Sequence, residues 1–326
     1  MFNKKIAEVA GKILAPDAQA VSNDDAYILA SLPAEDTLDL IFLAHKIKRK
    51  HEKQLILCSI INAKSGYCTE DCAFCAQSSH HKTGINTYDL LRKEEMVDSA
   101  IRLYEAGATR YSMVTSGYML TDEEVETVCG ATAAIREKTD LKVCASLGML
   151  TLSTAKSLKK GGISVYHHNL ETSRSFFKRV CTTHDYEEDI ETVKLAKLSG
   201  MKVCSGGILG LGETWEQRVE LAVTLRELNV DGIPLNFLNP IAGTKMEKMP
   251  LLSPTEALKC IALFRIINPD KDILICGGRE VTLVDYQSWI MLAGANGVMI
   301  GNYLTTQGRN VKMDMDMVED GRPWLI

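Results

Sequence analysis

The sequence predicts an α/β fold, a (β/α)8 TIM-type barrel preceded by an N-terminal helical extension. From residue 55 onward, eight short apolar runs alternate with longer amphipathic stretches, a pattern typical of parallel strands joined by helices. The roughly 270 residues from Leu55 to the end match the usual size of such a barrel. No Pro/Gly/Ser-rich linker or charge block divides them. An open doubly wound sheet is the alternative fold, because the same periodicity fits both arrangements.

The elements follow in order along three expected segments: a helical extension (1–54), the barrel (55–305) and a C-terminal tail (306–326). In the extension, Ser22 and Asn23 predict a helix start, and residues 36–50 form an amphipathic run. Capping boxes are expected at Thr121 with Glu124 and at Ser253 with Glu256. The expected strands are 55–61, 109–114, 141–146, 163–168, 201–207, 232–237, 272–278 and 296–300.

Composition excludes several classes of function. The chain has 326 residues, with 37 Lys and Arg against 42 Asp and Glu, a net charge of −5. This balance gives no basic surface for nucleic acid or an anionic membrane. No apolar run is long enough to span a bilayer, and the N-terminus lacks the apolar core of a signal peptide. We expect a soluble, cytoplasmic protein that binds neither nucleic acid nor membrane.

Three of the ten cysteines are bunched directly after the first expected strand. Cys68, Cys72 and Cys75 form a C-x3-C-x2-C loop. Thiolates this close can converge on one soft metal centre. An iron–sulfur cubane normally takes four cysteines, so three would leave one iron open to another ligand. A zinc site completed by His80 or His81 is the alternative.

An aromatic residue, Phe74, precedes the last cysteine of the loop, and the whole motif resembles the signature of radical S-adenosylmethionine enzymes. Longer stretches at 65–84, 166–173, 202–213, 243–246, 277–280 and 293–301 closely resemble the biotin synthase family. The resemblance covers roughly residues 40 to 305. It implies that the three cysteines hold a 4Fe–4S cluster whose open iron chelates S-adenosylmethionine, and that the reaction inserts sulfur into dethiobiotin.

The resemblance also implies an auxiliary iron–sulfur cluster that donates the sulfur, usually a 2Fe–2S cluster held by three cysteines and one arginine. Cys144, Cys204 and Arg279 match three of these positions, and Arg279 is the residue to which we assign a catalytic role. The fourth position holds Ser112, and a neutral hydroxyl is a poor iron ligand. We therefore expect Cys276, with Cys58 as a fourth ligand, to complete a 4Fe-type cluster. Simple core packing is the alternative for these two cysteines.

Further site residues follow from the same resemblance. The residues expected at the cofactor are Phe74, Ser116, Gly117, Asn169, Glu171, His184, Ile208 and Leu211. Those expected at the substrate are Asn169 and Asn236. Strand alternation independently predicts that His167, Asn169 and Glu171 point inward. Core packing is expected for Cys129 and Cys260, and Cys181 is given no role.

The expected partners are dethiobiotin, an electron donor such as flavodoxin or ferredoxin, and a second copy of the chain in a homodimer. Two other functions remain open. A related radical enzyme could act on a different small molecule, which Ser112 favours. A non-catalytic iron–sulfur or zinc protein would need neither a full barrel nor an open iron.

Overall fold

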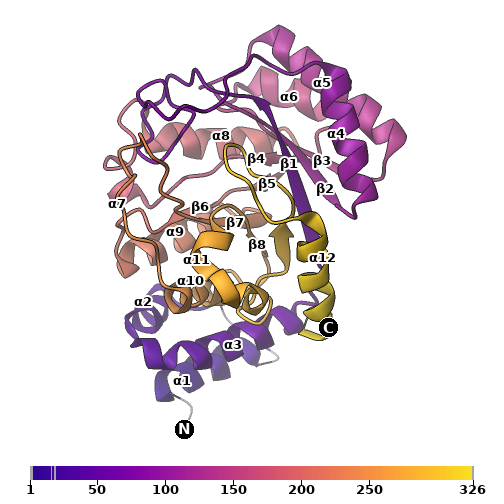
Figure 1. The fold of residues 1–326 in the computed structure, drawn as a ribbon. Coiled ribbons are helices and arrows are strands. Elements are labelled where there is room, and N and C mark those ends of the chain that lie inside the picture. The colour runs from indigo at the N-terminus through magenta and orange to yellow at the C-terminus, as the bar shows by residue number, and fades with distance from the viewer. Residues whose placement is uncertain (1–2, 16, 18–19, 325–326) are drawn as a thin grey trace.

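The computed structural model describes residues 3–15, 17 and 20–324, and its centre is a closed barrel of parallel strands (Figure 1). Each expected strand is present, which confirms the predicted barrel. The strands are β1 (Ile56–Lys64), β2 (Arg110–Thr115), β3 (Lys142–Ser146), β4 (Val165–His167), β5 (Lys202–Cys204), β6 (Gly207–Leu209), β7 (Gly232–Phe237), β8 (Asp272–Ile275) and β9 (Gly297–Met299).

Two short segments, β5 and β6, share one position in the barrel. β5 pairs with β4 and, through Cys204 opposite Gly232, with β7, and β6 continues the pairing with β7. The break between them lies at Ser205 and Gly206. A Cβ atom on Gly206 would lie 1.9 Å from the Pro234 carbonyl oxygen, so only glycine fits there. This contact between β5 and β7 closes the barrel.

Helices cover the outside of the barrel and follow the strands in the expected alternation (Figure 1). Most carry the apolar face that packs on the strands, and α10 is buried along almost its whole length. They are α4 (Lys93–Glu105), α5 (Asp122–Lys138), α6 (Leu152–Lys160), α7 (Arg174–Phe177), α8 (Tyr186–Leu198), α9 (Trp215–Glu227), α10 (Pro254–Ile267) and α11 (Arg279–Leu283).

The predicted capping boxes differ in outcome. At Thr121 the box is reciprocal, because the Thr121 hydroxyl accepts from the Glu124 amide and the Glu124 carboxylate accepts from the Thr121 amide. At Ser253 the hydroxyl accepts from the Glu256 amide. The Glu256 carboxylate instead accepts a hydrogen bond from Arg218 at 2.7 Å.

The N-terminal helices α1 (Lys4–Leu14), α2 (Asn23–Ser31) and α3 (Thr37–Lys50) pack against the end of the barrel at which the strands begin (Figure 1). A short 3-10 turn, η1 (Ala34–Asp36), joins the last two. Buried Lys259 of α10 ties this layer down by donating to the carbonyl oxygens of Ala30 and Leu32. Within the described residues, the helices are too short or too polar to cross a membrane.

The C-terminal segment, expected as a tail, contains a helix on the outside of the barrel (Figure 1). Its elements are α12 (Val311–Asp320) and η3 (Arg322–Trp324), and a further 3-10 segment, η2 (Val284–Ile290), precedes β9 within the expected barrel. Asp314 of α12 is fully buried and accepts a hydrogen bond from the Arg279 guanidinium at 2.8 Å. This buried ion pair fixes α12 to the barrel.

Removing one partner of a buried ion pair leaves the other charge uncompensated. We predict that Asp314→Ala lowers the free energy of unfolding by about 3–5 kcal/mol, measured by urea denaturation. Asp316→Ala is the matched control, because Asp316 pairs with Lys312 on the exposed face of the same helix. The control should change stability by less than about 1 kcal/mol. Equal losses in the two variants would contradict this role for the buried pair.

Candidate active site

A large cavity opens at the ends of the strands where catalytic groups of such barrels gather. It encloses about 1500 Å³, including space open to solvent, and side chains from almost every strand line it. The inner part carries four cysteines, Cys58, Cys144, Cys204 and Cys276. Nearer the mouth lie Phe74 and Cys75 from the cysteine loop.

The four inner cysteines come from β1, β3, β5 and the residue after β8. Strand register turns them toward one interior, with Cys58 opposite Arg110 on β2 and Cys144 opposite Ser112 on the same strand. Burial raises the pKa of the Cys58 thiol to about 12 and that of Cys204 to about 11. Burial, together with neighbouring thiols, also raises the pKa values of Cys144 and Cys276. The structure therefore groups thiols that are hard to ionise unless a cation binds them.

The arginine beside these thiols is Arg110. Its Nη1 lies 4.0 Å from the Cys204 Sγ, and its Nη2 lies 3.1 Å from the Asp272 carboxylate. Sequence reasoning missed this residue, although alternation along β2 places it on the same inward face as Ser112.

Arg279, which the resemblance places at the auxiliary cluster, is not among the residues that line the cavity. Its guanidinium is fully buried, and it donates to Asp314 at 2.8 Å and to Gln287 at 2.7 Å. The geometry therefore gives no support to a cluster-binding or catalytic role for Arg279. A partner far along the chain decides its direction, which the local sequence does not reveal.

Two further observations test whether the inner cavity suits a buried cluster. The Ser112 hydroxyl oxygen is buried and has no hydrogen-bond partner among the described residues, so the wall keeps a polar atom free. A Cβ atom on Gly232 would lie 2.8 Å from the Cys204 sulfur, so glycine leaves room for that sulfur. Free thiols, an unpaired hydroxyl and a cationic Arg110 form a donor set that fits an iron–sulfur cluster.

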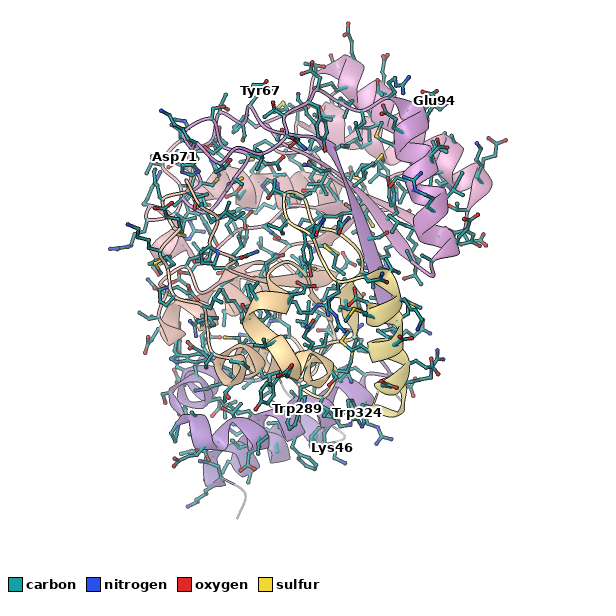
Figure 2. The ribbon with its side chains drawn as sticks, viewed as in Figure 1. Lys46, Tyr67, Asp71, Glu94, Trp289 and Trp324 are labelled. Atoms are coloured by element: carbon teal, nitrogen blue, oxygen red, sulfur yellow. The ribbon has the colours of Figure 1, made fainter. Side chains whose placement is uncertain are left out.

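The second group of thiols lies on the loop between β1 and α4, at the cavity mouth. Figure 2 labels Tyr67 and Asp71 in this loop. The backbone holds the loop, since the Cys68 amide donates to the Gln77 carbonyl and the Ser79 amide donates to the Cys68 carbonyl. All three cysteines are free.

The two histidines that could complete a zinc site are each bonded to the loop backbone. His80 Nε2 lies 3.0 Å from the Thr69 carbonyl oxygen, and His81 Nδ1 lies 2.8 Å from that of Cys75. Each bond leaves the other ring nitrogen available for a metal, and that of His81 is buried without a partner among the described residues. The histidine geometry therefore does not distinguish a zinc site from an iron–sulfur cluster.

A line of polar side chains runs along the cavity wall between the two groups of thiols. His167 Nε2 lies 3.0 Å from Asn169 Oδ1, and Asn169 Nδ2 donates to a Glu171 oxygen at 3.3 Å. All three line the cavity, as strand alternation predicted. Burial lowers the pKa of His167 to about 4 and raises that of Glu171 to about 8, so both are predominantly neutral at pH 7.

Asn236 also lines the cavity, near the end of β7. Its carboxamide oxygen accepts from the Gly277 amide at 2.9 Å, and its nitrogen donates to the Gly207 carbonyl at 3.3 Å. These two bonds fix which end of the carboxamide is donor and which is acceptor.

The remaining expected cofactor residues divide into two groups. Ile208 lines the cavity. Leu211 packs behind the wall in a small apolar cluster with Phe74 and Ile208. Ser116 donates to the Gly66 carbonyl at 2.6 Å and supports the cysteine loop, and Gly117 follows it with a positive φ of 104°.

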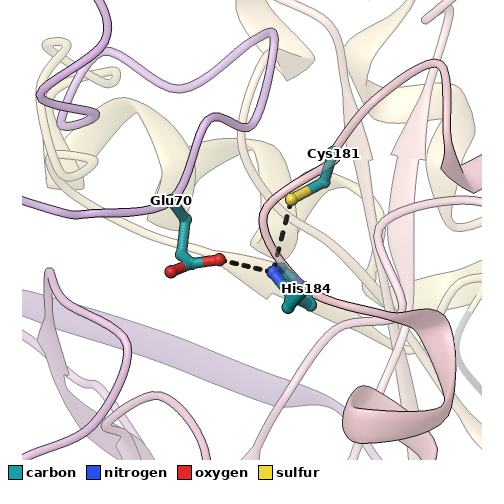
Figure 3. Close-up of side chains that lie close together, drawn as sticks. All are labelled: Glu70, Cys181 and His184. Atoms are coloured by element: carbon teal, nitrogen blue, oxygen red, sulfur yellow. Dashed lines mark hydrogen bonds and ion pairs between the residues drawn. The ribbon is translucent and has the colours of Figure 1, made fainter.

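His184 also lies outside the residues that line the cavity. It is bonded to Glu70 at 2.6 Å and contacts Cys181, for which no role was expected (Figure 3). No local motif marks Cys181, because what brings it to the cysteine loop is tertiary packing.

Comparison with known families agrees with this geometry. The Radical SAM superfamily model matches residues 63–225, and the model of the Biotin and Thiamin Synthesis associated domain matches residues 234–321. With its cysteine loop at the mouth of a closed parallel barrel, the chain is a radical S-adenosylmethionine enzyme.

Curated relatives narrow the class to a family. The chain is 59% identical to biotin synthase of Syntrophus aciditrophicus, over 98% of this chain and 99% of that protein. It is 50% identical to biotin synthase of Geobacter metallireducens, over 98% of this chain and 97% of that protein. The chain belongs to the biotin synthase family, and membership implies a 4Fe–4S cluster and S-adenosylmethionine as cofactors.

Solved structures support the fold. Methylornithine synthase superimposes with a TM-score of 0.81 at 19% identity, covering 97% of this chain and 95% of that one. The FeFe-hydrogenase maturase HydG from Carboxydothermus hydrogenoformans gives 0.80 at 19% identity, covering 98% of this chain and 78% of that one. At these identities the likeness concerns the barrel alone.

The raised pKa of Glu171 predicts a pH dependence. Between about pH 4.5 and pH 8, the folded chain holds a proton here that the unfolded chain has lost, so this group's contribution to stability falls as pH rises. Glu171→Gln removes that contribution. The stability of the variant relative to the wild type should therefore increase from pH 5 to pH 8.

Urea denaturation of the reduced, cluster-free chain at several pH values measures this difference. Glu105→Gln is the control, since Glu105 is exposed on α4. Its stability difference from the wild type should not change with pH. A pH-independent difference for Glu171→Gln as well would show that Glu171 titrates normally.

Proposed function

We propose that the chain inserts sulfur into dethiobiotin to form biotin, with the substrate held between two groups of cysteines. The observation that carries the proposal is that Cys75 of the loop and all four inner cysteines line the same cavity. A substrate in that cavity would have the radical source on one side and the sulfur source on the other. Both are needed to replace unactivated C–H bonds by C–S bonds.

At the mouth, Cys68, Cys72 and Cys75 would hold the 4Fe–4S cluster. That cluster supplies the electron that cleaves S-adenosylmethionine to the radical that abstracts hydrogen. The protein's own contribution is to hold the loop at the cavity mouth, through the backbone bonds of Cys68 with Gln77 and Ser79. Phe74 and Ile208 form an apolar wall there, suited to a purine face, while Asn169 and Glu171 offer polar groups suited to ribose hydroxyls.

Inside, Cys58, Cys144, Cys204 and Cys276 would hold the auxiliary cluster. We propose a 4Fe-type cluster in place of the usual 2Fe–2S form, because Ser112 stands where a third ligand of the usual pattern is expected. Four thiolates can hold either type, so the iron content decides between them. Arg110, placed against Cys204, would balance part of the negative charge of four thiolates. We assign this role to Arg110 in place of Arg279.

The substrate's ureido ring offers both donors and an acceptor. Asn236 presents a carboxamide whose orientation is already fixed by Gly207 and Gly277, which suits recognition of that ring. Asn169 lies between His167 and Glu171, where one side chain can reach both substrate and cofactor. The neutral His167 and Glu171 add no unpaired charge to the cavity.

The proposal includes an electron donor such as flavodoxin or ferredoxin, a homodimer and a cytoplasmic location. These follow from resemblance to the family. A related enzyme acting on another small molecule is the alternative, and Ser112 is the residue that favours it.

Anaerobic turnover of the iron- and sulfide-reconstituted chain tests the function. With S-adenosylmethionine, reductant and dethiobiotin, we expect biotin together with about two equivalents of 5′-deoxyadenosine, because two C–H bonds must break. Cys276→Ala should lower biotin formation by about tenfold or more while S-adenosylmethionine cleavage continues. Cys129→Ala, on the outer helix α5, is the matched control and should form biotin normally.

Mass spectrometry of the products separates the alternatives. Deoxyadenosine without biotin would move the substrate to another small molecule. Zinc in place of iron, with neither product, would contradict the radical assignment. Normal biotin formation by Cys276→Ala would remove Cys276 from the sulfur source.

A further inference from the structure

Tyr303 lines the cavity from the segment between β9 and α12, and the function proposed above gives it no role. Its ring lies against two glycines. A Cβ atom on Gly277 would lie 4.0 Å from Tyr303 Cδ1, and one on Gly308 would lie 3.4 Å from Tyr303 Cε2. The same Cβ position on Gly277 is 3.3 Å from Asn236 Oδ1. The ring therefore lies beside Asn236, against the backbone that follows Cys276.

Glu280 turns the hydroxyl of Tyr303 out of the cavity. The hydroxyl donates to the Glu280 carboxylate, with its oxygen 2.7 Å from one carboxylate oxygen and 2.9 Å from the other. Glu280 is not among the residues that line the cavity, so the polar end of the phenol points into the wall and the ring faces the cavity. The Tyr303 amide donates to the Thr306 carbonyl at 3.1 Å, which anchors the same residue through its backbone.

Arg279 holds Glu280 in turn. Its Nη2 lies 3.2 Å from the Glu280 carboxylate and 2.8 Å from that of Asp314 on α12. The same Asp314 oxygen lies 3.9 Å from Arg309 Nε, at the far end of the segment that carries Tyr303. The side chains of Arg279 and Asp314 have no exposed surface, so solvent screens the attraction between them little. A chain of charges thus connects α12 to the cavity wall.

We infer that Arg279 and Glu280 are positioning residues for Tyr303, whose ring sets the width of the substrate site beside Asn236. The inference rests on the proposed function, which places the ureido ring of dethiobiotin at Asn236. With its hydroxyl engaged by Glu280, Tyr303 presents an apolar face next to a polar carboxamide. A substrate that is wider than dethiobiotin at this point meets the ring, so Tyr303 selects by size.

This arrangement gives the charge of Arg279 an effect on a cavity that it does not line. The carboxylate of Glu280 has two tasks, because it balances the guanidinium and accepts from the phenol. Without that carboxylate the phenol loses its charged acceptor, and a buried hydroxyl without an acceptor is costly. Tyr303 would then leave the position that its bond to Glu280 holds.

Equilibrium dialysis with labelled dethiobiotin measures the effect without turnover. The full chain is reconstituted with iron and sulfide and loaded with S-adenosylmethionine, and reductant is left out. Tyr303→Ala should raise the dissociation constant for dethiobiotin by about tenfold or more. Tyr303→Phe removes the bond to Glu280 and Glu280→Gln weakens it, and each should raise the constant about threefold to tenfold. Tyr286→Phe is the matched control, because Tyr286 is exposed on η2, and should bind as the wild type does.

A wider homologue of dethiobiotin separates size selection from support of the fold. In this homologue an ethyl group replaces the methyl group on the ureido ring. The wild type should bind it about tenfold more weakly than dethiobiotin, and Tyr303→Ala should remove most of that difference. A ring that only supports the fold would weaken both ligands equally when removed. An equal ratio of the two affinities in wild type and Tyr303→Ala would overturn the inference.

Fluorine NMR of the same unreduced chain reports on the ring itself. With 3-fluorotyrosine throughout the chain, the Tyr303 resonance is the one that is absent from Tyr303→Phe. Glu280→Gln should shift this resonance, and so should dethiobiotin added to the wild type. The Tyr286 resonance should stay in place in both cases. If Glu280→Gln leaves the Tyr303 resonance unchanged, Glu280 does not position the ring and the inference is wrong.

The inference and the proposed function fail in different ways. A wild type that neither binds dethiobiotin nor forms biotin contradicts the proposed substrate. The Tyr303 resonance, recorded without ligand in wild type and Glu280→Gln, would still support or overturn the positioning. A wild type that forms biotin, with affinities and resonances unaltered in the variants, would contradict the inference alone.

Discussion

The site depends on closure of the barrel between β5 and β7. Cys204 pairs with Gly232 there, and the missing side chain of Gly232 leaves space for the Cys204 sulfur. Closure makes the inward faces of all strands meet around one cavity, so cysteines far apart in sequence become neighbours. An open sheet would spread Cys58, Cys144 and Cys276 along an edge, and no common cluster could form.

The same burial that gathers the thiols makes them costly to ionise without iron. Cys58 and Cys204 have pKa values raised to about 12 and about 11, and Arg110 is the nearest fixed cation for both. Metal binding supplies the missing positive charge and displaces the protons. We therefore expect assembly of the proposed inner site to be coupled to cluster insertion, whereas the outer loop is held by its own backbone and by Asp71.

The sequence predicts the regular features well and the long-range ones poorly. Apolar periodicity gives each strand, and alternation gives the inward line of His167, Asn169 and Glu171. The direction of Arg279 depends on Asp314, which belongs to a helix in the expected tail, so neither local pattern nor the resemblance reveals that Arg279 lies outside the cavity lining. Cys181 lies beside the cysteine loop only because bonds join the two segments, and no spacing rule marks such a neighbour.

The central claim is that Cys58, Cys144, Cys204 and Cys276 together hold the auxiliary cluster. Iron analysis and ⁵⁷Fe Mössbauer spectroscopy of a reconstituted chain in which Cys68, Cys72 and Cys75 are all changed to Ala test it most directly, since only auxiliary iron remains. The account predicts about four irons per chain, most of them lost when Cys58 or Cys276 is also changed to Ala. About two irons per chain, retained after both changes, would contradict it.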